Sequence, residues 1–167
     1  GTGRVSVTLG AGCPPPSGEV PAAPDDLVRR ALREDAARVD VELHVDIPPM
    51  SGYGSSAAVA VALLRARRAL RGEPAAPLEA LWTEALAVEQ AAHAKPSGVD
   101  PAIVVWGIPL RFTRSAESAP RIEPQPFARP LFIVAGCCGD HGGTRVSVTG
   151  LATLKAERPA LVEAAMA

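Results

Sequence analysis

The stretch that decides the fold is Pro48-Pro49-Met50-Ser51-Gly52-Tyr53-Gly54-Ser55-Ser56-Ala57-Ala58. The run before it, 39–47, alternates apolar and polar residues and predicts a strand with one buried face. After it, a run with an apolar stripe continues to about Arg71 and predicts a helix. A strand, a glycine turn and a helix start bring free backbone amides to the positive end of a helix dipole, which suits a phosphate. A tight turn without a ligand is the alternative, because the loop has neither a Walker A lysine nor Gly-x-Gly-x-x-Gly spacing.

The patterns on both sides of this stretch predict one domain that mixes helices and strands. Alternation and short apolar runs indicate strands, spacings of three and four residues indicate helices, and Gly and Pro clusters indicate loops. We expect strands over 4–9, 39–47, 103–106, 110–112 and, as a buried strand, 131–135; helices over 24–37, 55–71, 77–93 and from 145 onward; loops over 10–24, 96–100 and 136–144; and a polar, Pro-rich stretch over 113–130. Asp25 is expected to cap the first helix. Together these elements predict helices packed on a mixed sheet.

The composition describes one soluble globular domain. Of 167 residues, 47% are apolar and 21% are charged, and the net charge is −1. A nucleic-acid binder usually needs a basic excess, and no run approaches the roughly 18 apolar residues of a membrane span. Three cysteines, Cys13, Cys137 and Cys138, cannot all pair with one another, so we interpret them as reduced thiols in a cytoplasm. A small-molecule or protein partner is therefore expected, with no nucleic acid and no membrane.

One carboxylate, that of Glu89, is expected to point at the core. At 100° per residue it falls within the apolar face of the predicted helix 77–93. That face is formed by Leu78, Trp82, Ala85 and Ala92. Burial of an unpaired carboxylate costs several kcal/mol, so Glu89 should meet a cation, a strong donor or a metal ion. A buried salt bridge to an arginine is the alternative to a functional role.

Two further groupings allow a metal interpretation. His93 follows Glu89 by one helical turn, and Asp100 could complete a transition-metal site with them. That spacing is unspecific, and His93 more often bonds the last carbonyls of a helix. A second set comprises Cys137, Cys138, Asp140 and His141. Their spacing differs from Cys-x-x-Cys, so loop packing is the preferred interpretation.

Other charged side chains are expected to be solvated. His44 falls on the polar face of the strand 39–47. The helix after Ser56 carries four arginines that could contact an anion, although a solvated face is the usual role of such a cluster. These are Arg65, Arg67, Arg68 and Arg71.

Two segments carry a resemblance to a known family. The stretch 48–58 resembles the phosphate loop of the GHMP kinases. The segment Glu89-Gln90-Ala91-Ala92-His93-Ala94-Lys95-Pro96-Ser97-Gly98-Val99-Asp100 is similar to the one that distinguishes the mevalonate kinases within that family. Trp106-Gly107 follows where that branch often has an aromatic residue and Gly, and Gly143-Thr144 ends a stretch like a later loop of the family. The resemblance spans about Val39 to Thr144, with the segments in the expected order.

The resemblance implies an α+β fold, the two-layer arrangement of ribosomal protein S5 domain 2, with a left-handed β-α-β crossover that departs from the usual hand. It implies that 1–167 is a GHMP kinase N-terminal, ATP-binding domain, incomplete at both ends. The family's N-terminal Lys-containing substrate motif has no counterpart here, and neither has its C-terminal domain. We therefore expect these 167 residues alone to have negligible activity.

The resemblance also implies the chemistry, which is phosphoryl transfer from ATP with Mg²⁺ to the hydroxyl of a small hydroxy acid, mevalonate first. It assigns nucleotide binding to Pro49, Gly52, Gly54, Ser55, Ser56 and Ala57, and Mg²⁺ to Ser56 and Glu89. Asp100 would act as general base or orient the acceptor hydroxyl, and Ser97 and Gly98 would shape the acceptor pocket.

Alternatives remain at this point. The acceptor could instead be phosphomevalonate or a sugar. The function could instead be that of a truncated domain, which binds a nucleotide or a protein without turnover. A homodimer is a possible assembly.

Overall fold

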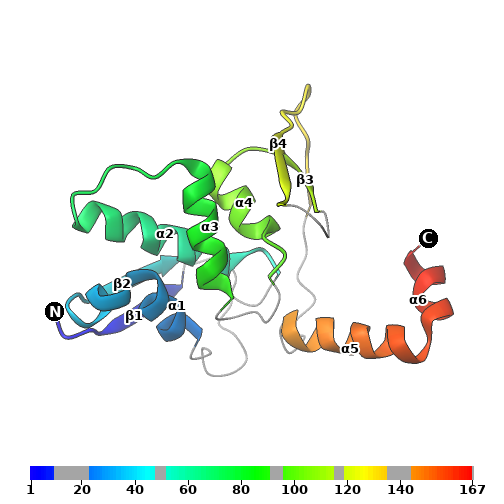
Figure 1. The fold of residues 1–167 in the computed structure, drawn as a ribbon, viewed down its shortest axis with the longest axis horizontal. Coiled ribbons are helices and arrows are strands. Elements are labelled where there is room, and N and C mark those ends of the chain that lie inside the picture. The colour runs from blue at the N-terminus through cyan, green and yellow to red at the C-terminus, as the bar shows by residue number, and fades with distance from the viewer. Residues whose placement is uncertain (10–22, 48–51, 91–95, 115–118, 135–143, 167) are drawn as a thin grey trace.

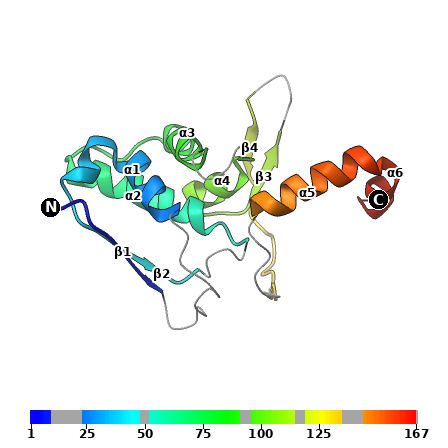
Figure 2. The same cartoon turned by 90° about the horizontal axis from the view of Figure 1, so that it is seen from below.

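The computed structural model describes residues 1–9, 23–47, 52–90, 96–114, 119–134 and 144–166. In chain order the elements are β1 (Val5–Leu9), α1 (Ala23–Leu32), the 3-10 helix η1 (Arg33–Ala37), β2 (Val41–Val45), α2 (Ser55–Leu70), α3 (Leu78–Glu89), α4 (Val99–Trp106), β3 (Leu110–Thr113), β4 (Arg121–Pro124), α5 (Thr144–Glu157) and α6 (Pro159–Met166). Helices α1 to α4 cluster together, and α5 and α6 extend away from them (Figures 1 and 2). The expected mixture of helices and strands is confirmed.

Strands β1 and β2 form a parallel pair on one side of the helices (Figure 2). Val5 lies opposite Val41, and Thr8 lies opposite His44. Val5, Val41 and Leu43 pack against the core, whereas His44 is exposed, as its place in the alternation predicts. Helix α1 connects the two strands in sequence, so the pair is a β-α-β unit with its apolar face toward the helices.

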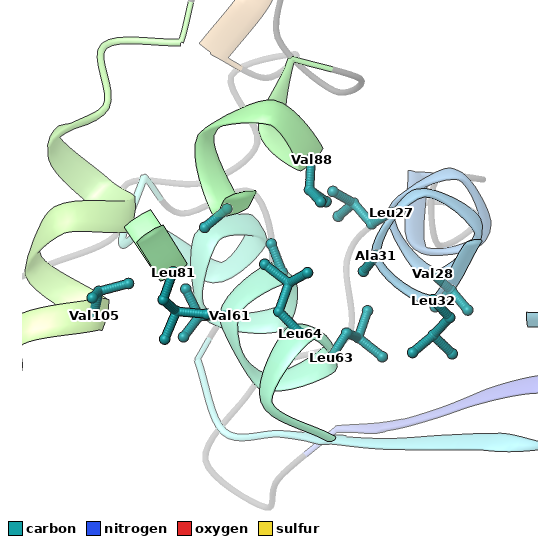
Figure 3. Packing of buried hydrophobic residues seen from close by; sticks show 12 residues of the cluster. Leu27, Val28, Ala31, Leu32, Val61, Leu63, Leu64, Leu81, Val88 and Val105 are labelled. Carbon is teal, nitrogen blue, oxygen red and sulfur yellow. The ribbon is translucent and has the colours of Figure 1, made fainter. Parts of the chain in front are cut away.

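Helix α2 is the centre of the core and packs against α1, α3 and α4 (Figure 3). Its Val61 is 1% exposed and its Leu64 2% exposed, and Val28 of α1 is 2% exposed. The cluster comprises Leu27, Val28, Ala31, Leu32, Ala60, Val61, Leu63, Leu64, Leu81, Ala85, Val88 and Val105. Burial on several sides fixes the position of α2 and therefore of its first turn.

The buried faces of α2 and α3 are centred differently from the sequence expectation. In α3, Leu81 and Val88 are buried, whereas Leu78 is 42% exposed. In α2, Leu70, which the spacing places on the apolar stripe, is 59% exposed. A helix that packs against several neighbours buries a broad face. The centre of that face cannot be read from one set of residues spaced three and four apart.

Helix α4 corrects the expectation of a loop over 96–100 followed by a strand over 103–106. The helix begins at Val99 after Gly98 and ends at Trp106 before Gly107, and both glycines have positive φ, of 83° and 65°. Pro101 lies in the first turn, where its missing N–H is not needed. A short apolar run such as Ile103 to Trp106 fits either a buried helix or a strand, so its composition alone misled the prediction.

The apolar run 131–134 is not the buried strand that the sequence predicts. Leu131 is 58% exposed and Val134 is 99% exposed, and no strand includes them. Ala135 lies outside the described residues. A strand needs a neighbour to take its backbone hydrogen bonds, and no described strand pairs with this run.

A strand that the sequence did not predict lies within the Pro-rich stretch 113–130. Strand β4 pairs antiparallel with the expected β3, with Phe112 opposite Ile122 and Leu110 opposite Pro124. Pro124 is the last residue of its strand, where a missing donor is tolerated.

The first helix begins earlier than the sequence predicts. It starts at Ala23, so Asp25 lies in its first turn rather than at its cap. The helical sequence expected from 145 onward is confirmed as α5 and α6.

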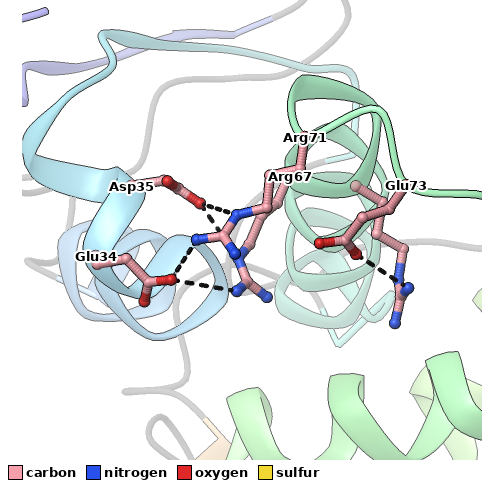
Figure 4. A network of polar contacts seen from close by, with 6 residues as sticks. Glu34, Asp35, Arg67, Arg71 and Glu73 are labelled. Carbon is pink, nitrogen blue, oxygen red and sulfur yellow. Dashed lines mark hydrogen bonds and ion pairs between the residues drawn. The ribbon is translucent and has the colours of Figure 1, made fainter.

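Two arginines at the end of α2, Arg67 and Arg71, form an ion-pair network with η1 (Figure 4). Arg71 Nε lies 2.7 Å from Asp35 Oδ2, and Arg71 also pairs with Glu34. Arg67 Nε lies 3.5 Å from the same Asp35 oxygen. The Arg71 hydrogen bond lowers the pKa of the Asp35 carboxyl, and Asp35 in turn raises the pKa of Arg71. The network fixes η1 against the end of α2, so these cations are neither a free anion site nor an unpaired solvated face.

Asp40 fixes the chain ahead of β1. Its Oδ1 accepts hydrogen bonds from Thr2 N and Thr2 Oγ1, each at 2.8 Å, and from Arg4 N at 3.2 Å. These bonds, led by that from the Thr2 backbone, lower the pKa of Asp40 from 3.8 to about 2. The contacts precede the pairing of Val5 with Val41 and help to set its register.

We expect the stabilising charge of Asp40 to be lost in acid. Because the folded-state pKa is lowered, the contribution is present above pH 3.8 and is lost as the pH falls through about 2. Asp40→Asn should therefore be less stable than wild type at pH 7, and the two should converge near pH 2. Urea unfolding at several pH values measures this. Asp46→Asn, an exposed carboxylate just after β2, is the control; a difference for Asp40→Asn that is independent of pH would contradict the assignment.

Candidate active site

The first turn of α2 offers backbone amides to an anion. Gly54 precedes the helix with φ of 71°, a left-handed conformation that other residues adopt only with strain. The first amides of a helix have no partner within it, and α2 has no acidic side chain in its first turn. The amides of Ser55, Ser56 and Ala57 therefore lie at the positive end of the dipole, as the glycine turn predicts. The Ala57 side chain itself is buried.

Glu89 meets this turn from the end of α3. Glu89 is only 2% exposed, which confirms the prediction that this residue is buried. Ser56 Oγ donates a hydrogen bond of 2.8 Å to Glu89 Oε1. A hydroxyl and a buried carboxylate side by side are hard oxygen donors of the kind that Mg²⁺ prefers, and that ion usually keeps several waters. Ser56 and Glu89 therefore fit a Mg²⁺ ion.

Asp100 lies beside the glycine turn. It is exposed, in the first turn of α4. A Cβ atom at Gly54 would lie 3.5 Å from Asp100 Cβ and 3.7 Å from Asp100 Cγ. The absence of a side chain at Gly54 thus lets the Asp100 carboxylate lie directly beside the start of α2. This places Asp100 beside Gly54, although the two residues are far apart in sequence.

The start of α4 is held by Trp82, Phe112 and Ser97. Trp82 Nε1 donates to Gly98 O at 2.9 Å, and a Cβ atom at Gly98 would lie 3.2 Å from Trp82 Cζ2 and 3.6 Å from Phe112 Cζ. Ser97 Oγ accepts a hydrogen bond from Val99 N at 3.2 Å. Sequence reasoning assigned Trp82 only to an apolar face; the signal it missed is that a half-buried indole N–H needs an acceptor.

Arginines that could have paired with Glu89 contact other groups. Arg68 pairs with Glu73 and Glu84, and Arg65 Nη2 donates to Val105 O at 3.4 Å, which links α2 to α4. Arg67 and Arg71 pair with η1, as described above. Glu89 accepts a hydrogen bond from the Ser56 hydroxyl.

Several predicted site residues lie outside the described residues. They are Pro49, His93, Cys13, Cys137, Cys138, Asp140 and His141. Gly52 is described, exposed and in a left-handed conformation with φ of 79°. Within the described ranges, no group of three or more His, Cys, Asp or Glu side chains is placed to hold a metal ion. No helix of those ranges is long and apolar enough to cross a membrane.

Comparison with known proteins adds a family. Residues 25–108, about half of the chain, match the family model described as GHMP kinases N terminal domain. A mevalonate kinase of Pyrococcus horikoshii is 36% identical over 143 residues, which cover 81% of this chain and 39% of that protein. One from Thermococcus gammatolerans is 30% identical over 138 residues, covering 83% of this chain and 39% of that protein, and one from Aeropyrum pernix is 46% identical over 68 residues, covering 41% and 21%.

The chain thus spans about two fifths or less of the length of these relatives. No solved structure gave a significant match. The family match runs from α1 to the end of α4 and includes the glycine turn, Glu89 and Asp100. It shows that this chain belongs to the GHMP kinase family, as a partial member that resembles the mevalonate kinases.

Proposed function

We propose that this chain carries the nucleotide and acceptor site of a kinase that transfers the γ-phosphoryl group of ATP to the hydroxyl of mevalonate. The observation that carries the proposal is the meeting of three groups at one point. The amides after Gly54, the Ser56–Glu89 oxygen pair and the Asp100 carboxylate converge from three helices. Phosphoryl transfer requires positioning and neutralisation of charge, which these groups supply.

In this reaction the acceptor hydroxyl oxygen forms a bond to the γ-phosphorus, and the bond between that phosphorus and the β,γ-bridging oxygen breaks. ADP leaves, and the hydroxyl proton passes to Asp100 or to solvent. The amides of Ser55 and Ser56 would bind phosphate oxygens as donors. The exposed Asp100 carboxylate would meet the acceptor hydroxyl beside this turn.

Mg²⁺, when bound, would neutralise charge on the transferred phosphoryl group. Ser56 Oγ and Glu89 Oε1 would hold it, because they are the paired hard oxygens at this turn. Burial of Glu89 places a carboxyl group close to a helix start that has no acidic side chain in its own first turn.

The acceptor pocket is proposed at the start of α4. Ser97 is exposed and next to Gly98, one turn from Asp100. Mevalonate is the acceptor that the similarity to three mevalonate kinases favours. The same resemblance supports the proposal that the β-α-β unit and its helices follow the S5 domain 2 arrangement.

We expect Mg·ATP to bind at the start of α2. Amide NMR of the chain titrated with Mg·ATP should show shifts concentrated on Gly54, Ser55, Ser56 and Glu89, because those groups would contact phosphate and metal. Gly54→Ala should weaken this response, since Ala is strained at the positive φ that sets this turn. Gly72→Ala is the matched control, as Gly72 also has a positive φ of 66° but lies beyond the far end of α2. A response confined to 65–71 would contradict the proposal.

A binding domain without turnover is the alternative function that the sequence left open. The complete gene product decides between the two. ADP release that depends on mevalonate supports the kinase, and release that depends instead on phosphomevalonate or a sugar changes the acceptor. Saturable Mg·ATP binding with no ADP release from any of the three acceptors supports the binding domain.

A further inference from the structure

Trp82 links α3 to the start of α4 through a specific polar contact. Its indole N–H donates to the Gly98 carbonyl at 2.9 Å, across sixteen residues of sequence. The ring also packs against Phe112 of β3 in an edge-to-face arrangement, with centroids 6.5 Å apart and planes at 60°. Trp82 is half-buried. Through these two contacts it joins its own helix to the start of α4 and to β3.

Gly98 is the residue through which Trp82 can act on α4. It is buried, and its φ of 83° sets the turn from which α4 begins. The Gly98 Cα lies against the Trp82 ring so closely that an added Cβ would approach Trp82 Cζ2 at 3.2 Å. Gly98 O also accepts the Ala102 amide at 3.2 Å, the first bond of the helix. The indole thus bonds the same carbonyl that begins α4.

Asp100 follows Gly98 by two residues and is exposed. An exposed carboxylate is not held by its own packing, so its direction depends on the backbone that carries it. That backbone is the first turn of α4, which Trp82 and Phe112 hold from the buried side. The result is the close approach of Asp100 to Gly54, at 3.5 Å from the Cβ position of that glycine.

We propose that Trp82 is a positioning residue for the acceptor chemistry: its N–H bond to Gly98 sets the place of Asp100 beside the phosphate turn. This inference rests on the proposed function, in which Asp100 acts on the acceptor hydroxyl. Trp82 itself touches no reacting group. Displacement of a reacting group by about 1 Å costs up to about a hundredfold in rate, so a positioning contact has a measurable effect.

The test uses Trp82→Phe in the complete gene product, which keeps an aromatic ring against Phe112 and removes the N–H donor. We expect kcat to fall by about tenfold. The KM for Mg·ATP should stay within about twofold, because Ser56 and Glu89 are not touched. Trp106→Phe is the matched control, since Trp106 also packs against the core but lies at the other end of α4. It should change neither constant.

A double variant separates positioning from general loss of structure. If Trp82 acts through Asp100, then Trp82→Phe should lower kcat no further in an Asp100→Asn background. Additive losses would overturn the proposal. So would a rise in KM for Mg·ATP with kcat unchanged, or an equal loss of kcat in Trp106→Phe.

A structural readout keeps this inference distinct from the proposed function. An NMR cross-peak between Gly54 Hα and Asp100 Hβ, measured in the 167-residue chain, should be lost in Trp82→Phe and kept in Trp106→Phe. If the gene product phosphorylates none of the acceptors, the proposed function fails, and this cross-peak alone decides whether Trp82 positions Asp100. Its retention in Trp82→Phe would overturn the inference whatever the activity.

Discussion

Asp100→Asn is expected to lower kcat of the complete gene product by about 10² or more, with little change in the affinity for Mg·ATP. The substitution keeps the size and shape of the side chain but removes the charge that accepts or orients the hydroxyl proton. Asp100 lies beside Gly54, whereas the oxygens proposed to hold the metal belong to Ser56 and Glu89. The loss should therefore fall on the chemical step. Steady-state kinetics, the nucleotide Kd and the melting temperature measure the three effects.

A purely structural role for Asp100 predicts a different result. Its place in the first turn of α4 allows a favourable interaction with the helix dipole, worth about 1 kcal/mol or less at an exposed site. Asp26 is an exposed carboxylate in the first turn of α1, so Asp26→Asn is the matched control. If Asp100→Asn changed only the melting temperature, and by as much as Asp26→Asn does, Asp100 would be removed from the catalytic residues.

Local patterns were sufficient to predict the two helices that carry Ser56 and Glu89. The glycine turn and two serines predict the start of α2, and 100° periodicity predicts that Glu89 is buried. Both inferences depend only on residues within one or two helical turns. The contact between Ser56 and Glu89 needed more, because thirty-three residues separate them. It was implied by the family resemblance, whereas the periodicity alone favoured a buried salt bridge, for example to an arginine.

Helix α4 shows where local patterns fail. Its apolar residues Ile103 to Trp106 fit a strand or a helix equally well. The choice is made by Gly98 and Gly107, whose positive φ values bound the helix, and by the contacts of α4 with α2 and α3. The spacing of apolar residues indicates neither the positive φ values of these glycines nor the contacts of α4 with its neighbours. The same limit applies to 131–134, where an apolar run has no described partner strand.

Contacts between residues far apart in sequence could not be predicted from local patterns either. Arg71 and Asp35 are thirty-six residues apart, and their bond depends on how η1 meets the end of α2. A run of arginines on one helix indicates charge but not its partners. The Trp82 bond to Gly98 is of the same kind, since it depends on the angle between α3 and α4.

Glu89→Gln is expected to raise the Mg²⁺ concentration needed for half-maximal rate by about tenfold or more, because even the partners behind a metal ligand contribute about 10- to 100-fold in affinity. The amide oxygen of Gln can still accept the Ser56 hydroxyl, so the fold should persist. A Mg²⁺-dependent shift in the melting temperature should weaken in parallel. That second readout does not depend on turnover.

Glu84→Gln is the matched control on the same helix. Glu84 pairs with Arg68 on the far side from the glycine turn, so its loss should cost stability of about 1 kcal/mol or less and leave the Mg²⁺ requirement unchanged. Asp100→Asn should also leave that requirement unchanged while it lowers kcat. The two site carboxylates should therefore have distinct kinetic signatures under the proposed function, with Glu89 acting on metal affinity and Asp100 on the chemical step. Equal Mg²⁺ dependence in Glu89→Gln and Glu84→Gln would show that the buried carboxylate stabilises the packing of α3 on α2 and does not hold the metal.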